Sequence, residues 1–218
     1  MNAYQLWELL FDPPKAEWFE QKLDHFNPTD TRTWKQRYFK AGPDSSDTLF
    51  VLIGGESPAS PIWMVSCMWT RWGKKHNAVR LQLEHRFYGD SRPTKDMSVD
   101  NLQYLSSEQA LSDLANFITV MKNQFKASKV IVFGASYSGA LAAWFRIKYP
   151  YLVDGAVASS APVFLQMDFK GYLEVVAQSL NTFKPVNACN DAISVATAAL
   201  KEKLKTPQGR KALKEQFK

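Results

Sequence analysis

The sequence contains few cysteines, few histidines and no long hydrophobic stretch. Its 218 residues include two cysteines, Cys67 and Cys189, which could be free thiols, one long-range disulfide, or halves of bridges to partner chains. The cysteine count therefore leaves the redox compartment open. The three histidines lie in the first half of the chain, at positions 25, 76 and 85. Because no apolar run reaches the roughly 18 residues of a membrane span, we expect no membrane partner.

The N-terminal residues also lack the features of a secretory signal peptide. They show no basic segment followed by a long apolar core and a small-residue cleavage site. We expect residues 1–18 to form a leader with little regular structure.

Positive charge is concentrated at the C-terminal end. The formal net charge is +6, and residues 201–218 contain seven Lys or Arg against two Glu. Such a run could bind nucleic acid or an anionic membrane, or it could be the solvated face of an amphipathic helix. Phe217 is the single aromatic residue in this run, so there is no pattern of alternating aromatic and basic residues, and no recognised nucleic-acid motif is present. We therefore favour the solvated helix and expect no nucleic-acid partner.

Hydrophobic periodicity predicts alternating strands and helices up to about residue 160. The predicted strands are residues 34–39, 48–53, 78–83, 130–134 and 155–160, and the predicted helices are 106–125 and 140–148. A capping box formed by Ser106 and Gln109 is expected to begin the first helix. This order is typical of a parallel α/β sheet. After Pro162 the sequence shows only helical patterns, at 167–180 and 188–204.

The strongest chemical signal lies at the end of the predicted strand 130–134, where a serine precedes a helix. Very small residues surround Ser136 at positions 134, 135, 138 and 139, which are Gly134, Ala135, Ser138 and Gly139. A strained strand-to-helix turn of this kind is a nucleophile elbow, and the N–H of Tyr137 would then lie at a helix N-terminus, as an oxyanion donor. The usual spacing is G-x-S-x-G, whereas here Ser138 takes the place of the second glycine. The alternative is a plain turn between a strand and a helix.

Two further loops follow predicted strands, where an α/β sheet carries its reactive groups. Gly54 and Gly55 are followed by Glu56, and we expect Gly55 to supply a second oxyanion N–H; an ordinary tight turn is the alternative. His85, between Glu84 and Arg86, could be a general base, but it precedes the serine. We favour a partnered structural histidine and expect both Glu56 and His85 to line the substrate cleft.

Several motifs together resemble one family of serine peptidases. They are residues 19–27 (FEQKLDHFN), 84–91 (EHRFYGDS), 105–111 (LSSEQAL), 134–139 (GASYSG), 141–146 (LAAWFR) and 158–162 (ASSAP). They resemble the family of prolyl carboxypeptidase, dipeptidyl peptidase II and thymus-specific serine protease, over about residues 18–218. The family's elbow is Gly-Gly-Ser-Tyr-x-Gly, from which only Ala135 departs. Residues 167–176 and Cys189 are most similar to the thymus-specific branch.

The resemblance implies a serine exopeptidase with an α/β-hydrolase domain interrupted by a helical cap. It implies that residues 19–163 belong to the hydrolase domain and residues 164–218 to the beginning of the cap. Ser136 would be the nucleophile, the N–H groups of Tyr137 and Gly55 would form the oxyanion hole, and a peptide would be the substrate. No cofactor or metal is implied, the family is secreted or lysosomal, and the oligomeric state is left open.

The resemblance also implies an incomplete triad. In α/β-hydrolases the order along the chain is Ser, then Asp or Glu, then His, and no histidine follows Ser136 here. We therefore expect the chain to be the N-terminal part of a peptidase, with a loosely packed helical segment from Phe164 onward and no activity in isolation. The alternatives are a non-catalytic peptide-binding chain, and an esterase or lipase on the same fold, which the motif set and the cap disfavour.

Overall fold

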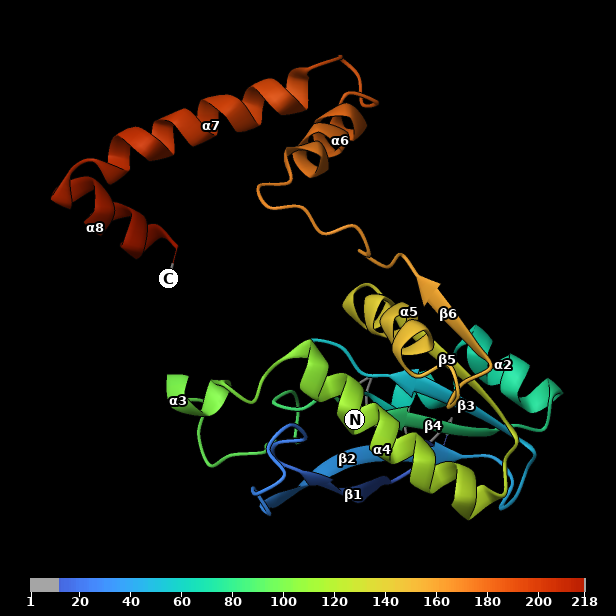
Figure 1. The fold of residues 1–218 in the computed structure, drawn as a ribbon. Coiled ribbons are helices and arrows are strands. Elements are labelled where there is room, and N and C mark those ends of the chain that lie inside the picture. Colours follow the sequence, from blue (N-terminus) through green and yellow to red (C-terminus); the bar gives the residue numbers. More distant parts are fainter. Residues whose placement is uncertain (1–11, 218) are drawn as a thin grey trace. The chain divides into compact units, whose positions relative to one another are not determined.

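The computed structural model describes residues 12–217, which form two compact units divided between Val163 and Phe164 (Figure 1). The first unit contains β1 (Ala16–Lys22), β2 (Thr33–Ala41), β3 (Thr48–Ile53), η1 (Pro61–Met64), α2 (Met68–Lys75), β4 (Val79–Leu83), α3 (Val99–Leu102), α4 (Ser107–Phe125), β5 (Lys129–Ala135), α5 (Tyr137–Lys148) and β6 (Gly155–Ser159). The second contains α6 (Lys170–Leu180), α7 (Ala188–Leu204) and α8 (Pro207–Gln216).

The first unit is built on one mixed sheet with the strand order β1-β2-β4-β3-β5-β6. The strands from β4 through β3 and β5 to β6 run parallel, which confirms the predicted α/β class. β1 and β2 add an antiparallel edge next to β4. The expected leader was too long, because β1 already begins at Ala16. This strand lies at the sheet edge and is half-exposed, so it lacks the apolar run that marks the central strands.

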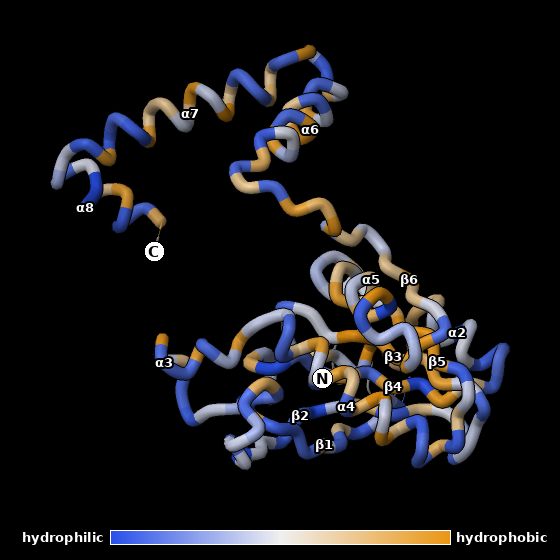
Figure 2. Tube along the Cα trace, in the orientation of Figure 1, coloured by the Kyte–Doolittle hydropathy of each residue, from blue (hydrophilic) through white to orange (hydrophobic). Residues whose placement is uncertain are grey.

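Alternating side chains of the central strands form two cores on opposite faces of the sheet. In β3, Leu49 and Val51 pack toward α4 and α5, whereas Phe50 packs with Phe133 toward η1 and α2. Figure 2 shows the hydrophobic residues concentrated in these central strands. Because both faces of the sheet are covered, the sequences of such parallel strands are nearly continuous runs of apolar residues.

The N-terminus of α4 differs in part from the predicted capping box. The Ser106 hydroxyl accepts a hydrogen bond from the backbone N–H of Gln109 at 3.1 Å, as expected. The Gln109 side chain does not return to Ser106. Its oxygen accepts from the N–H of His25 at 3.0 Å and its amide donates to Asp24 at 2.6 Å. The Gln109 side chain bonds a residue 84 positions away instead of the expected Ser106 N–H, because Gln109 is buried against the turn after β1.

The second unit is helical, as predicted, and buries none of the side chains of its helices. Its apolar residues are largely exposed; Leu173, for example, is 69% exposed and Ile193 is 54% exposed. α8 begins with Pro207 at its first turn, and the Thr206 hydroxyl caps it. The length and hydropathy of the helices in residues 12–217 leave none that could cross a membrane.

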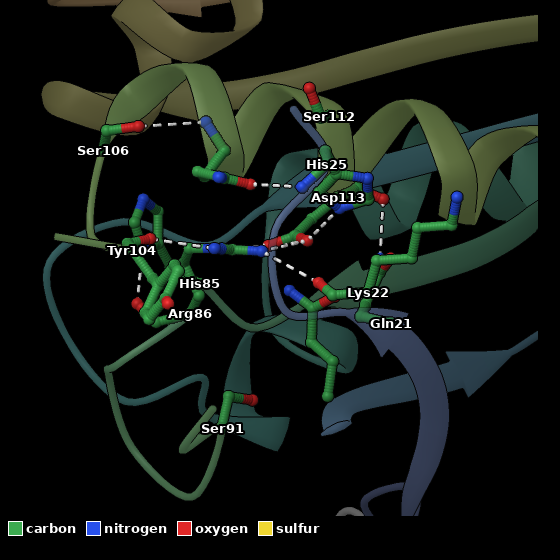
Figure 3. A network of polar contacts seen from close by, with 12 residues as sticks. Gln21, Lys22, His25, His85, Arg86, Ser91, Tyr104, Ser106, Ser112 and Asp113 are labelled. Carbon is green, nitrogen blue, oxygen red and sulfur yellow. Dashed lines mark hydrogen bonds and ion pairs between the residues drawn. The ribbon is translucent and has the colours of Figure 1, made fainter. Parts of the chain in front are cut away.

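A buried ion pair joins three parts of the first unit (Figure 3). Arg86, which follows β4, is fully buried and forms a bidentate pair with Asp113 of α4, at 2.7 and 2.8 Å. Its remaining N–H groups donate to the carbonyls of Lys22, Leu23 and Tyr104. His25 completes the cluster, with its Nε2 at 2.7 Å from the Asp113 carboxylate.

Replacing Arg86 with methionine should destabilise the first unit strongly. The change leaves Asp113 buried with one of its two partners removed, and breaking such a pair costs about 3–5 kcal/mol. Urea denaturation followed by tryptophan fluorescence would measure the loss. Arg32→Met is the matched control, since the Arg32 side chain is 61% exposed and the loss of its ion pair to water should have little effect. Equal effects of the two substitutions would contradict a special role for the buried pair.

Candidate active site

Ser136 occupies the turn between β5 and α5 in a strained backbone conformation. Its φ is 57° and its ψ is −127°, a region that side-chain-bearing residues rarely adopt. The turn is held by a hydrogen bond from the N–H of Ser136 to the carbonyl of Ser159, at 3.0 Å. The Ser136 residue is exposed at the carboxyl edge of the sheet. The expected strand-turn-helix is therefore present, with the serine at its apex.

Small neighbours are required because the strand and the helix approach each other closely at this turn. A Cβ on Gly134 would lie 2.0 Å from the carbonyl oxygen of Ser138, and one on Gly139 would lie 2.8 Å from that of Ser159. Ser138 stands where the common motif has glycine, and its hydroxyl closes the turn. It donates to the carbonyl of Ala135 at 2.9 Å and accepts from the N–H of Ala135 at 3.0 Å.

The Gly54–Gly55 loop lies against the elbow. Gly54 donates its N–H to the carbonyl of Leu83 at 2.8 Å, and a Cβ at Gly54 would be only 2.6 Å from that oxygen. A Cβ at Gly55 would make an ordinary contact, 3.5 Å from the Cβ of Ser138. Close approach therefore requires glycine at Gly54, while Gly55 is the residue that faces the elbow.

Ser136 borders a cavity of about 580 Å³ with a largely apolar lining, called the aromatic cavity below because four aromatic side chains form one wall of it. Trp63, Trp69, Trp72 and Phe133 line it, together with Met68, Cys67, Gly55 and Glu56. The sequence analysis did not predict this apolar wall of the cavity. The signal available was the recurrence of tryptophan at 63, 69 and 72, two of which stay more than 40% exposed in the structure.

Glu84 fixes the loops around this cavity. Its carboxylate is fully buried and pairs with Arg37 of β2. It also accepts hydrogen bonds from the backbone N–H of Ala59 at 2.9 Å and from the N–H and hydroxyl of Ser91 at 2.9 and 2.6 Å. One buried carboxylate thus anchors both the loop that follows Gly55 and the loop that follows β4.

His85 is a buried histidine whose two ring nitrogens have partners. Its Nδ1 lies 2.8 Å from the carbonyl of Arg86, and its Nε2 lies 3.1 Å from the hydroxyl of Tyr137. Since a carbonyl only accepts, Nδ1 carries the proton. Burial lowers the pKa of His85, so the ring is neutral and its Nε2 accepts from Tyr137. His85 therefore supports the side chain that follows the serine, as a partnered structural histidine would.

The other histidines do not approach the serine. His25 pairs with Asp113, and His76 ends α2 on the surface. Within residues 12–217 the Ser136 hydroxyl has no hydrogen-bonding histidine, and no group of three or more His, Cys, Asp and Glu could hold a metal ion.

A parallel sheet that delivers an exposed serine through a strained strand-to-helix turn is the architecture of an α/β-hydrolase. Solved structures agree at the level of the fold. The chain matches the peroxisomal α/β-hydrolase Lpx1 of Saccharomyces cerevisiae with a TM-score of 0.51 and 14% identity, over 78% of this chain and 52% of that one. It matches Rv0554 of Mycobacterium tuberculosis with a TM-score of 0.53 and 16% identity, over 82% and 57%.

The sequence profile of serine carboxypeptidase S28 matches residues 21–218, and the chain belongs to this family of serine peptidases. It is 39% identical to the thymus-specific serine protease of Mus musculus, over 87% of this chain and 38% of that protein. It is 38% identical to the lysosomal Pro-X carboxypeptidase of the same species, over 69% and 32%. The resemblance seen in the motifs is thus confirmed. The chain spans 38–42% of the length of the first curated relatives that it matches.

Replacing Gly134 with alanine should disrupt the elbow. The new methyl group would overlap backbone atoms of Ser138, which cannot move without opening the turn, at a cost of about 3 kcal/mol. Gly155→Ala is the matched control, since its methyl group would meet only the flexible end of Ile131 at 3.2 Å. Thermal unfolding would measure both, and a Gly134→Ala protein as stable as Gly155→Ala would contradict the close approach.

The buried neutral His85 should make the first unit less stable in acid. Because its pKa is lowered on folding, the unfolded state binds more protons below about pH 6.5, and the free energy of unfolding falls by up to about 1.4 kcal/mol per pH unit. His85→Asn keeps a donor for the Arg86 carbonyl and removes this titration. Urea denaturation at pH values between about 6.5 and 5 should therefore give a shallower pH dependence for His85→Asn. His76→Asn, at an exposed histidine, is the matched control. Equal slopes for the unsubstituted chain and His85→Asn would contradict the assignment.

Proposed function

We propose that Ser136 is the nucleophile of a serine peptidase that cleaves short peptides. The observation that carries this proposal is the backbone conformation of Ser136, at a φ of 57° and exposed at the edge of the sheet. Such strain costs of order 1–3 kcal/mol and persists where surrounding contacts hold it, as at active sites. The hydroxyl would give its proton to a general base and attack the peptide carbonyl. The C–N bond would then break, the amine would leave with that proton, and the acyl group would remain on the serine as an ester.

The N–H groups of Tyr137 and Gly55 are the proposed oxyanion hole. Among the residues that the structure describes, neither of these N–H groups has a hydrogen-bond acceptor. Tyr137 is the first residue of α5, so its N–H carries the positive end of the helix dipole. Two unpaired donors beside an exposed serine are what a developing oxyanion requires.

The general base is proposed to come from outside the 218 residues. His25 pairs with Asp113, His76 lies at the end of α2, and His85 bonds the carbonyl of Arg86. In α/β-hydrolases the catalytic histidine follows the serine and the acid along the chain. The same observation favours one alternative, a chain that binds peptides without cleaving them.

The proposed substrates are short peptides, cleaved from one end in a secreted or lysosomal compartment. One relative supports this, since it is a lysosomal Pro-X carboxypeptidase. The aromatic cavity beside Ser136 supports an apolar or ring-shaped side chain at the bond that is cleaved.

The purified chain should release no product from a fluorogenic dipeptide substrate. Loss of the base lowers turnover about a millionfold in dissected serine proteases. A longer peptidase that contains this sequence followed by an Asp and a His should be active and should lose activity with Ser136→Ala.

Ser159→Ala, which alters another serine of the same cavity, is the matched control and should remain active. The proposed source of the base would be overturned if the 218-residue chain turned over the substrate and lost this activity with Ser136→Ala and also with His85→Ala. A longer peptidase that is fully active with Ser136→Ala would overturn the nucleophile.

A further inference from the structure

Gln82 is a buried polar residue in a layer of apolar side chains. It lies on β4 between Leu81 and Leu83, which belong to the core beneath α4 and α5. Because successive side chains of a strand point to opposite faces, Gln82 faces the other layer, between the sheet and α2. The residue is 3% exposed. The sequence of β4 therefore places one amide group in the layer that contains the aromatic side chains of that face.

Among residues 12–217 the amide of Gln82 has no hydrogen-bond partner. Its oxygen is buried and unpaired, and no hydrogen bond joins its side chain to another residue of this range. Two other buried atoms in the same range share that lack, the amide oxygen of Gln36 and the Nε of Arg80. Of these three residues, only Gln82 lines the aromatic cavity. Since buried polar groups in proteins nearly always have partners, this amide indicates a group that enters the cavity from outside.

The neighbouring cavity at the carboxyl edge shows the opposite pattern. It has a volume of about 410 Å³ and a more polar lining, and we call it the polar cavity. Its lining consists of Glu56, which also lines the aromatic cavity, and of His85, Tyr88, Leu105, Ser106, Ser107 and Tyr137. The Tyr137 hydroxyl already bonds His85 at 3.1 Å and Ser107 at 3.0 Å. The unpaired amide therefore distinguishes the aromatic cavity from the polar one.

The rest of the aromatic cavity suits a flat ring. Its volume of about 580 Å³ lies in the range of about 300–1,000 Å³ that is typical of small-molecule sites. Its tryptophans and Phe133 can pack against a ring edge-on or offset. The polar groups of the lining are partly occupied, because the indole N–H of Trp69 donates to the carbonyl of Trp63 and the Ser138 hydroxyl bonds Ala135. A ring with a hydrogen-bond donor at its far end would meet both the apolar wall and the free acceptor.

We propose that Gln82 makes the aromatic cavity selective for a phenol ring, as in tyrosine. This inference rests on the proposed peptidase function and specifies a side chain of the peptide that Ser136 would attack. The phenol hydroxyl would donate to the Gln82 oxygen. A phenylalanine ring would fill the same space and leave that oxygen unpaired. A site whose buried polar group is left unpaired discriminates against the analogue that lacks the donor.

Binding of three small probes to the purified chain tests this proposal without turnover. The probes are the N-acetyl amides of tyrosine, phenylalanine and O-methyltyrosine, and the last of these keeps the phenol oxygen but cannot donate. Shifts of the assigned indole N–H signals of Trp63, Trp69 and Trp72 in NMR titrations would give the affinities and locate the probe in the aromatic cavity. The tyrosine probe should bind about threefold to tenfold more tightly than the other two, because one neutral hydrogen bond contributes that much.

The decisive variant is Gln82→Met, which keeps the length of the side chain and removes the amide. It should bind the tyrosine and phenylalanine probes with equal affinity. Ser159→Ala is the matched control, since Ser159 is another polar residue of the same lining, and it should keep the preference for tyrosine.

The stability of the variants gives a second measurement that needs no ligand. Gln82→Met should unfold at the same urea concentration as the unsubstituted chain or at a higher one, because the substitution breaks no hydrogen bond within residues 12–217. Gln36→Met is the matched comparison. It should unfold at a lower concentration, since the Gln36 amide donates to the carbonyl of Glu84 at 2.6 Å.

Four results would overturn the proposal. They are equal binding of the tyrosine and phenylalanine probes, equal binding of the tyrosine and O-methyltyrosine probes, a preference for tyrosine that survives in Gln82→Met, and no shift of the tryptophan signals with any probe at millimolar concentration. These results are distinct from failure of the peptidase function. A chain whose Ser136 is not a nucleophile still shows the Gln82-dependent preference, and an active peptidase without that preference contradicts only the role of Gln82.

Discussion

Burial of charge at the end of β4 is the constraint on which the rest of the first unit depends. Glu84, His85 and Arg86 are consecutive and almost completely excluded from water, and a buried charge is tolerated only when it is paired and hydrogen-bonded. Each side chain finds its partners in a different part of the chain. Glu84 holds the loops on either side of the aromatic cavity, His85 supports Tyr137, and Arg86 ties α4 to the turn after β1. Three neighbouring residues thus position the loop after Gly55, the loop after β4 and the side chain of Tyr137.

The two cavities at the carboxyl edge differ in chemistry because they lie over different parts of this framework. The aromatic cavity continues the core between the sheet and α2, where Trp69 packs near Phe133. The polar cavity lies over the β4 loop and the start of α4, where the buried residues are themselves polar. Ser136 borders the first cavity and Tyr137 the second, so an apolar and a polar surface meet at two consecutive residues.

The features that the sequence predicts well are those encoded by neighbouring residues. The elbow follows from the small residues between Gly134 and Gly139, and the alternation of strands and helices follows from local periodicity. The features that it misses depend on residues distant in sequence. Gln109 carries a correct capping signal, yet its side chain bonds His25 instead of Ser106, and Asp113 meets Arg86 and His25 across 27 and 88 residues. The strand β1 is missed for the same reason, since its pairing with β2 stabilises it more than its own composition does.

The two edges of the sheet are protected against self-association to very different degrees. β1 carries Glu17, Glu20 and Lys22 along its length, and charges of this kind discourage another strand from pairing there. β6 consists of Gly, Ala, Val, Ala and Ser, without charge or proline, and among residues 12–217 no strand pairs with its outer side. Its backbone N–H and C=O groups therefore form a template for strand addition. Lysine substitutions on β6 would give this edge the protection that Glu17, Glu20 and Lys22 give to β1.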